Sequence, residues 1–184
     1  MKPTSLSRTA HTLALASAAL ALAACSTPAP RPAPVTSISA SARLTPTTGN
    51  TTNGIVRFVQ TGNTVRVTGG ISGLKPGAVH GFHIHEKGDC SSGDGMGTGG
   101  HFNPTSTPHG NHDHGAHHVG DLPSLTANAF GVATLNFESD SIRLDGPTDI
   151  TGRGLIVHRD PDDYTTQPTG NSGPRLACAV ITKN

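Results

Sequence analysis

The chain has 184 residues and a formal net charge of +1, with 23 glycines, 14 prolines and only 3% aromatic residues. This length suits one domain with a real core plus short extensions. The abundance of turn formers argues against a helical bundle and favours short strands. The sequence has no basic patch with interleaved aromatic residues, so we expect no nucleic-acid partner.

The first 24 residues have the organisation of an export signal. Lys2 and Arg8 form a positive start, and the uncharged Leu/Ala-rich stretch 12–24 is too short for a comfortable membrane span. It ends in Leu-Ala-Ala-Cys25, which resembles the lipobox of bacterial lipoproteins, whose cysteine becomes the lipidated first residue. We therefore predict a lipoprotein signal peptide at 1–24 and a protein anchored by Cys25 on the periplasmic or cell-surface side of a membrane. The alternative is an ordinary secretory signal in which Cys25 is incidental.

Residues 25–35 have a proline at every second position from 28 to 34. This repetition predicts an extended polyproline-II tether that holds the following domain, 36–184, away from the membrane. Three cysteines in an exported protein leave one unpaired. If Cys25 carries lipid, Cys90 and Cys178 remain, and an oxidising compartment favours their disulfide over two free thiols.

The domain has the pattern of an all-β protein. We expect strands at 37–44, 54–60, 64–68, 80–86, 132–137, 155–158 and 176–181, because these segments alternate apolar and polar residues or form short apolar runs. Short strands at this spacing predict a Greek-key β-barrel or immunoglobulin-like sandwich. Two irregular segments, 87–123 and 159–174, carry most of the candidate ligands, so we expect two long functional loops.

The spacing of the histidines indicates a metal site. In Gly-Phe82-His83-Ile84-His85-Glu, the two-residue period of a strand puts both histidines on one face and both apolar residues on the other. Four neutral imidazoles suit copper, and three histidines with one carboxylate suit tetrahedral zinc. The sequence can supply both sets if one histidine of the long loop, such as His101, uses both ring nitrogens.

Five segments in order resemble the signature blocks of copper-zinc superoxide dismutases, and with the N-terminal signal the chain is similar to exported bacterial lipoprotein-type members. The segments are Gly81-Phe82-His83-Ile84-His85-Glu86, Gly100-His101-Phe102-Asn103-Pro104, His118-Val119-Gly120-Asp121-Leu122, Val157-His158, and Gly170-Asn171 through Arg175-Leu176-Ala177-Cys178. The resemblance covers 36–184. It implies an enzyme that disproportionates superoxide to oxygen and hydrogen peroxide by cycling copper(II) and copper(I), with one copper and one zinc ion per subunit.

The resemblance also implies a role for individual residues. Copper would be held by His83, His85, His101 and His158, and zinc by His101, His109, His118 and Asp121. His101 would therefore bridge the two ions, releasing copper and taking up a proton on reduction. Asp162 would join ligand histidines of the two metals. Arg175 would attract and orient superoxide, and the Cys90–Cys178 disulfide would anchor the loop beside it.

Other polar residues have less specific interpretations. His80 has the wrong strand parity for the ligand face, so we expect a structural role. His112, His114 and His117 exceed what the family needs and form either a solvated polar loop or a metal-gathering loop. His117 and His118 compete for one zinc role, and the register with the following Val-Gly-Asp favours His118. Arg153 is expected to make a structural contact.

Three functions compete for this sequence. The first is a dismutase that protects the cell envelope from extracytoplasmic superoxide. Its partners would be superoxide, the membrane and, in a homodimer, a second copy of the chain. The second is a non-catalytic copper or zinc carrier, which would need neither Arg175 nor a bridging histidine. The third is a structural or adhesive domain, which would leave the histidine spacing unexplained. The segment 164–170 lacks the charged residues that many eukaryotic members use to steer substrate.

Overall fold

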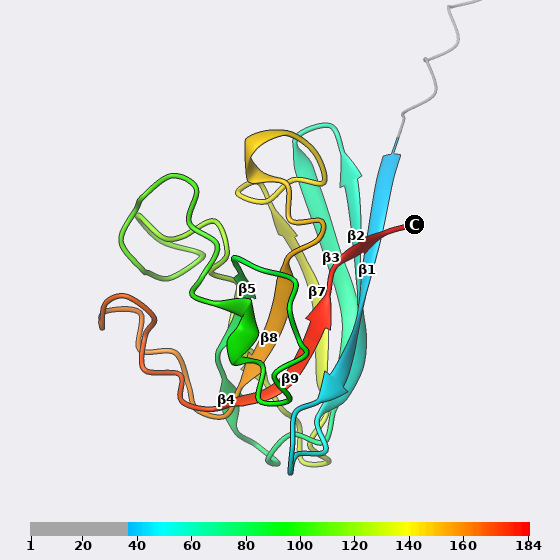
Figure 1. Ribbon diagram of the computed structural model, residues 1–184, viewed down its shortest axis with the longest axis vertical. Helices are drawn as coiled ribbons and strands as arrows, with labels where there is room; N and C mark the ends of the chain where they lie inside the picture. Colours follow the sequence, from blue (N-terminus) through cyan, green and yellow to red (C-terminus); the bar gives the residue numbers. More distant parts are fainter. Residues whose placement is uncertain (1–36) are drawn as a thin grey trace, which may run out of the picture. The chain divides into compact units, whose positions relative to one another are not determined.

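The computed structural model describes residues 37–184, which form ten strands and two short 3-10 turns (Figure 1). The predicted signal peptide, Cys25 and the proline-rich tether lie outside the described residues. The strands are β1 (Ser37–Pro46), β2 (Asn53–Thr61), β3 (Thr64–Ser72), β4 (Val79–His80), β5 (Phe82–His85), β6 (Leu125–Thr126), β7 (Ala133–Ser139), β8 (Gly154–His158), β9 (Arg175–Val180) and β10 (Thr182–Lys183), and the turns are η1 (Met96–Thr98) and η2 (Gly146–Thr148).

Eight strands form one curled antiparallel sheet. Their order is β5-β8-β9-β1-β2-β3-β7, and β10 adds to β1. The pairing of β9 with β1 brings the last long strand beside the first, while β1, β2, β3 and β7 form a meander. This order is consistent with a Greek-key barrel, so the predicted all-β fold class is confirmed.

The core is built from the alternating strand residues that the sequence singles out. On β2, Val56 and Phe58 are fully buried while Arg57 between them is exposed, and on β3 Val65 and Val67 are buried in the same way. The interior of residues 37–184 contains mostly Val, Leu, Ile and Ala. Burial of these aliphatic side chains supplies the main favourable term in folding, so period-two alternation accounts for the long strands.

The predicted strand 80–86 is wrong as one element. The chain divides at Gly81 into β4, which pairs with β6, and β5, which pairs with β8. The Gly81 N–H donates to the carbonyl of Asp160 at 2.8 Å, and its carbonyl accepts from the N–H of His158 at 2.9 Å. A Cβ at this position would lie 2.7 Å from the Cβ of Ser172, so the crossing requires glycine. The two-residue strands β6 and β10 are too short to show a periodic signal in the sequence.

The first long loop is held against the free edge of β5. The N–H of Ile84 donates to Gly120 at 2.8 Å, the N–H of Phe102 donates to Ile84 at 2.8 Å, and the N–H of Glu86 donates to Gly100 at 2.9 Å. A Cβ at Gly120 would collide with the carbonyl of Ile84, so glycine permits this close approach. Figure 1 shows this loop, in green, on the same side of the barrel as the orange 159–174 loop. Backbone pairing thus orders a segment without strand periodicity.

Cys90 and Cys178 form a disulfide with their Cα atoms 5.9 Å apart, as the sequence predicts. The bond joins the first long loop to β9 and closes 88 residues of chain. We expect replacement of both cysteines by serine to lower the free energy of unfolding of the metal-free protein by about 4 to 5 kcal/mol, because the unfolded chain regains entropy. Urea denaturation measures this loss. Each single serine variant should lose about as much, and a double variant within about 1 kcal/mol of the parent would contradict the expectation.

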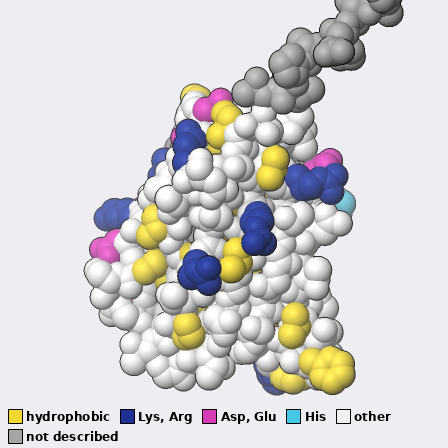
Figure 2. Space-filling model, turned by 90° about the vertical axis from the view of Figure 1, so that its right-hand side faces the viewer, with side chains coloured by type: hydrophobic (Ala, Val, Ile, Leu, Met, Phe, Trp, Pro, Cys, Tyr) yellow, Lys and Arg dark blue, Asp and Glu magenta, His cyan; other side chains and the backbone are white. Residues whose placement is uncertain are grey.

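The surface of the barrel offers little continuous apolar area in the view of Figure 2, where hydrophobic side chains stand singly or in small groups and Lys and Arg are scattered. Within residues 37–184, no helix has the length and apolar composition that a membrane span requires. Phe130 and Met96 are the most exposed large hydrophobic residues described, at 88% and 61%. Single exposed residues of this kind are common on soluble domains and need a specific argument before they carry a function.

Candidate metal centre

The structure brings together two groups of buried side chains, each of which offers ligand atoms within 4.8 Å of one another. The four-histidine group consists of His83, His85, His101 and His158, and the three-histidine group consists of His101, His109, His118 and Asp121. The groups share His101. Strand β5 supplies two members, the end of β8 supplies one, and the first long loop supplies the rest. These are the same two sets that the family resemblance implies.

The rings of the four-histidine group are fixed from outside so that nitrogens face inward. His85 donates from Nδ1 to the carbonyl of Gly99 at 2.9 Å, and His158 donates from Nδ1 to the carbonyl of Gly173 at 3.1 Å. Their Nε2 atoms then lie 3.4 Å from each other. The rings of His83 and His101 stack with centroids 3.9 Å apart. Backbone carbonyls therefore set the tautomers that leave the inner nitrogens free for a metal.

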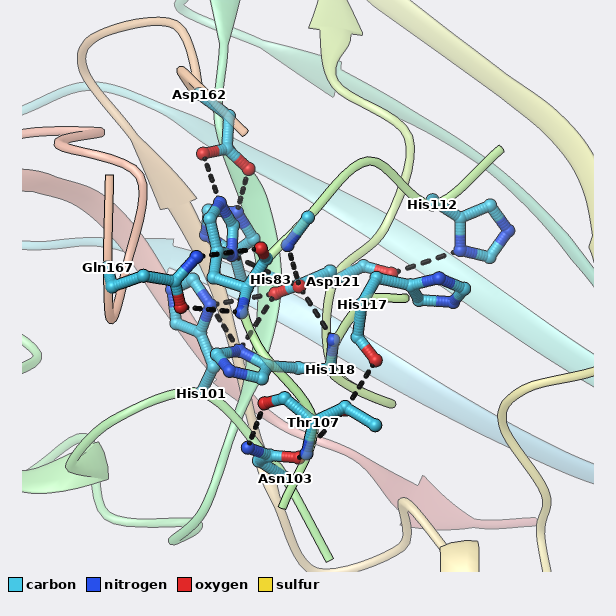
Figure 3. Close-up of polar contacts among 12 residues, drawn as sticks. His83, His101, Asn103, Thr107, His112, His117, His118, Asp121, Asp162 and Gln167 are labelled. Atoms are coloured by element: carbon cyan, nitrogen blue, oxygen red, sulfur yellow. Dashed lines mark hydrogen bonds and ion pairs between the residues drawn. The ribbon is translucent and has the colours of Figure 1, made fainter. Parts of the chain in front are cut away.

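The three-histidine group is organised by the carboxylate of Asp121 (Figure 3). Its oxygens lie 2.8 Å from His101 Nδ1, 3.1 Å from His109 Nδ1 and 3.3 Å from His118 Nδ1. The carboxylate also accepts from the backbone N–H groups of Gly110 and His118 at 3.2 and 2.8 Å. The loop 109–121 thus folds around one acidic side chain, which directs three Nδ1 atoms toward the same region.

Asp162 links the two groups from the second long loop. Its carboxylate lies 2.7 Å from His83 Nε2 and 2.8 Å from His109 Nε2, and both contacts are buried (Figure 3). Gly170 closes over this carboxylate with a φ of +65°, and a Cβ there would collide with Asp162. One acidic side chain therefore orients a histidine of each group, as the resemblance implies.

The protonation states of the site suit metal ligation. Burial lowers the pKa of His158 to about 3 and also lowers the pKa of His85. Burial lowers the pKa of His101 to about 4, although the hydrogen bond to Asp121 acts in the opposite direction. Burial acts to lower the pKa of His109, but the adjacent carboxylates of Asp121 and Asp162 raise it to about 9. At neutral pH His85, His101 and His158 are therefore neutral imidazoles, whereas His109 is an imidazolium between two carboxylates.

Among the described residues, four buried ring nitrogens have no hydrogen-bond partner. One is His80 Nε2, and the other three, His83 Nδ1, His101 Nε2 and His109 Nδ1, belong to the two histidine groups. Buried polar atoms are nearly always paired, so each of these requires an explanation. His83 belongs to the four-histidine group, His109 to the three-histidine group and His101 to both, and on each ring the other nitrogen contacts a carboxylate. His109 Nδ1 lies 3.1 Å from an oxygen of Asp121 but is not in hydrogen-bond geometry with it. Bound metal ions would satisfy all three, so the residues fit two metals joined by His101.

A cavity of about 300 Å³ opens onto the four-histidine group. Its lining includes His85, His101 and His158 together with Met96, Thr169 and Arg175, and we call it the Arg175 cavity. The half-buried Arg175 guanidinium is held by the carbonyls of Gly95 and Gly99, the latter at 2.7 Å, and by the hydroxyl of Thr98 at 2.7 Å. Among the described residues that line the cavity, Arg175 is the only Lys or Arg. The arrangement presents one fixed positive charge to a small anion.

The extra histidines lie outside both groups. His112 donates from Nδ1 to the carbonyl of Asp121 at 3.0 Å, and in Figure 3 it points away from the cluster. His117 Nε2 contacts the hydroxyl of Ser141 at 3.1 Å, whereas His118 is in the three-histidine group, where the sequence register places it. His114 is exposed. Two of the three thus hold the loop in place.

The expected structural roles of His80 and Arg153 agree with their contacts. His80 is buried and donates from Nδ1 to the carbonyl of His158 at 2.9 Å. The Arg153 guanidinium lies 3.5 Å from the centroid of the Phe102 ring and donates to the carbonyl of Glu86 at 2.8 Å. These contacts brace a strand end and the start of the first long loop.

Sequence reasoning missed residues that position or surround the site. Gln167 joins the two long loops, because its side chain accepts from the His109 N–H at 2.8 Å and donates to the His109 carbonyl at 2.9 Å. Met96 lines the Arg175 cavity, and the Gly95 and Gly99 carbonyls hold Arg175. No sequence signal marks these roles, because they depend on backbone groups and on how two loops meet.

Comparison with known proteins agrees with this geometry. The family model for copper/zinc superoxide dismutase (SODC) matches residues 52–181. A relative from Paramecium bursaria Chlorella virus 1, named superoxide dismutase [Cu-Zn], is 43% identical over 134 residues, which are 70% of this chain and 71% of the relative. The crystal structure of the clock protein EA4 is 40% identical, with a TM-score of 0.72, and the match covers 78% of this chain and 93% of that one. The chain belongs to the copper/zinc superoxide dismutase family, whose members bind copper and zinc.

Proposed function

We propose that copper binds the four-histidine group, that zinc binds the three-histidine group, and that superoxide reaches copper through the Arg175 cavity. The observation that carries the assignment is the set of unpartnered buried nitrogens on His83, His101 and His109. Four imidazoles suit copper, and three imidazoles with one carboxylate suit tetrahedral zinc. The test is metal analysis after loading: His158→Ala should lose copper and keep zinc, and His118→Ala should do the reverse.

The reaction converts two superoxide anions and two protons to oxygen and hydrogen peroxide. When bound, copper supplies the electron acceptor and donor through its two oxidation states, and zinc, which has no redox chemistry, supplies fixed geometry. Arg175 provides the positive charge that draws each anion into the cavity and orients it. The ring of His101 can hold one proton at Nε2, which faces no other polar partner in the described residues.

Zinc uptake should release a proton and weaken as the pH falls. The zinc-free protein holds His109 protonated below a pKa of about 9, against an ordinary value of 6.5. Zinc must displace that proton from Nδ1, so affinity should rise with pH by up to about tenfold per unit between about pH 7 and 9 and level off above. Calorimetry of zinc binding at pH 7 in two buffers of different ionisation enthalpy should give about one proton released. A value near zero would contradict this expectation.

We propose further that the protein is an exported lipoprotein that removes superoxide outside the cytoplasm and protects the cell envelope. The signal-like segment 1–24, the lipobox ending at Cys25 and the tether 25–35 support this location. The disulfide supports an oxidising compartment, because such bonds are rare in the cytosol. Cys25→Ser should move the protein from the membrane to the soluble extracytoplasmic fraction. Unchanged fractionation would exclude the lipid anchor. Sedimentation of the purified chain tests the further proposal of a homodimer.

A further inference from the structure

The dismutase reaction gives no role to Met96, a residue of the Arg175 cavity. Met96 lines this cavity together with His85, His101 and His158, and the residue is 61% exposed. Methionine usually fills gaps in buried cores, so a methionine in the wall of a metal-site cavity is unusual. The full sequence contains only one other methionine, Met1.

The backbone at Met96 is fixed rather than loose. Met96 begins η1, its N–H donates to the Asp94 carboxylate at 2.8 Å, and its carbonyl accepts from the Gly99 N–H at 3.2 Å. The carbonyls on either side, at Gly95 and Gly99, both accept from Arg175. The backbone segment that positions Arg175 therefore also places Met96 in the wall of this cavity.

The chemistry of the side chain distinguishes it from the rest of the cavity. The other donors in the lining are nitrogen and oxygen atoms, whereas the thioether is soft and polarisable and binds copper(I) in preference to zinc, magnesium or calcium. Met96 is solvent-exposed and lines the same cavity as three of the four histidines, so the wall of the cavity offers a thioether to an ion that enters from solvent.

We propose that Met96 is the first protein ligand for copper(I) on its way to the four-histidine group. Its thioether would hold the ion while solvent ligands are exchanged for the nitrogens of His85 and His158. This inference rests on the proposed assignment of copper to the four-histidine group. It concerns how the ion is acquired, so the side chain is not required to hold copper in the loaded protein.

The test is the rate of copper uptake by the full chain, loaded with zinc and free of copper. Copper is supplied anaerobically as the copper(I)–acetonitrile complex or, separately, as the copper(II)–glycine complex, and protein-bound copper is quantified after quenching with a chelator. Met96→Leu keeps the size and removes the sulfur. We expect it to slow uptake from copper(I) on the order of three- to tenfold and to leave uptake from copper(II) unchanged, because the thioether favours the softer ion. Both proteins should reach the same final copper content.

Phe130→Leu is the matched control, because Phe130 is exposed and absent from the cavity lining. Its uptake rates should equal those of the parent. Equal copper(I) rates for the parent and Met96→Leu would overturn the inference, and so would equal slowing with both oxidation states, which indicates a steric effect of the wall. If the parent itself binds no copper, the assignment of the four-histidine group fails and this inference fails with it. Copper that binds at an unchanged rate overturns only the role of Met96.

Discussion

Replacement of Arg175 by alanine should lower kcat/KM for superoxide by between about ten- and a hundredfold while copper and zinc contents stay unchanged. The guanidinium lines the cavity over the four-histidine group, and two carbonyls and one hydroxyl fix its position. It makes no hydrogen bond to a proposed metal ligand, and His85 keeps its own hydrogen bond to the Gly99 carbonyl without it, so we expect both metals to remain bound. Its loss removes the fixed charge that concentrates and orients the anion.

Superoxide decay measured at low and high ionic strength provides the readout for this variant. The parent should slow as salt rises, and Arg175→Ala should show a weaker salt dependence, because screening acts on the charge that has been removed. Arg175→Lys keeps the charge without the planar fork and should recover part of the rate. Arg159→Ala is the matched control, since Arg159 is exposed and paired with Asp160. An unchanged rate in Arg175→Ala, or a loss of copper, would show that Arg175 does not guide the substrate.

Replacement of Asp162 by alanine should weaken the binding of both metals, each by about ten- to a hundredfold. The Asp162 carboxylate orients His83 of the four-histidine group and His109 of the three-histidine group at 2.7 and 2.8 Å. Without it both rings are free to rotate, and the nitrogens that face the metals lose their fixed direction. Among the described residues, Asp162 is the only side chain outside the two groups that hydrogen-bonds to a histidine ring of each group.

Competition with chelators of known affinity measures the two dissociation constants of Asp162→Ala. Asp160→Ala is a suitable control, because that carboxylate lies nearby and pairs only with the exposed Arg159. Gly170→Ala offers a second route to the same effect, since a Cβ there would occupy the space of the Asp162 carboxylate. A variant that loses one metal and binds the other normally would contradict the proposed link between the groups.

Much of the fold follows from local sequence patterns. The alternation on β2 and β3 specifies which face is buried, and the spacing of His83 and His85 puts both on one face of β5. Strands β4 and β6 could not be predicted, because two residues have no period and their pairing depends on the tertiary contacts of Gly81. Alternation of apolar and polar residues is a local property of the sequence, whereas the point at which a short strand ends depends on contacts with distant segments of the chain.

The metal site also has a part that the sequence predicts and a part that it does not. The grouping of the ligands agrees with the family resemblance, because each ligand lies in a distinctive short segment, such as the one around His118 and Asp121. The supports of these ligands could not be predicted, since they are backbone carbonyls, at Gly99 for His85 and at Gly173 for His158. Every residue has a carbonyl, so no residue type marks those positions. The place of Met96 in the cavity was missed for the same reason.

The most direct test of the account is superoxide decay catalysed by the purified full chain, with its disulfide formed and loaded with one copper and one zinc ion. The account predicts rapid turnover that disappears when copper is removed and returns when copper is restored. A folded protein that holds both metals and shows no turnover would contradict it, and the chain would then act as a carrier of the metals it binds.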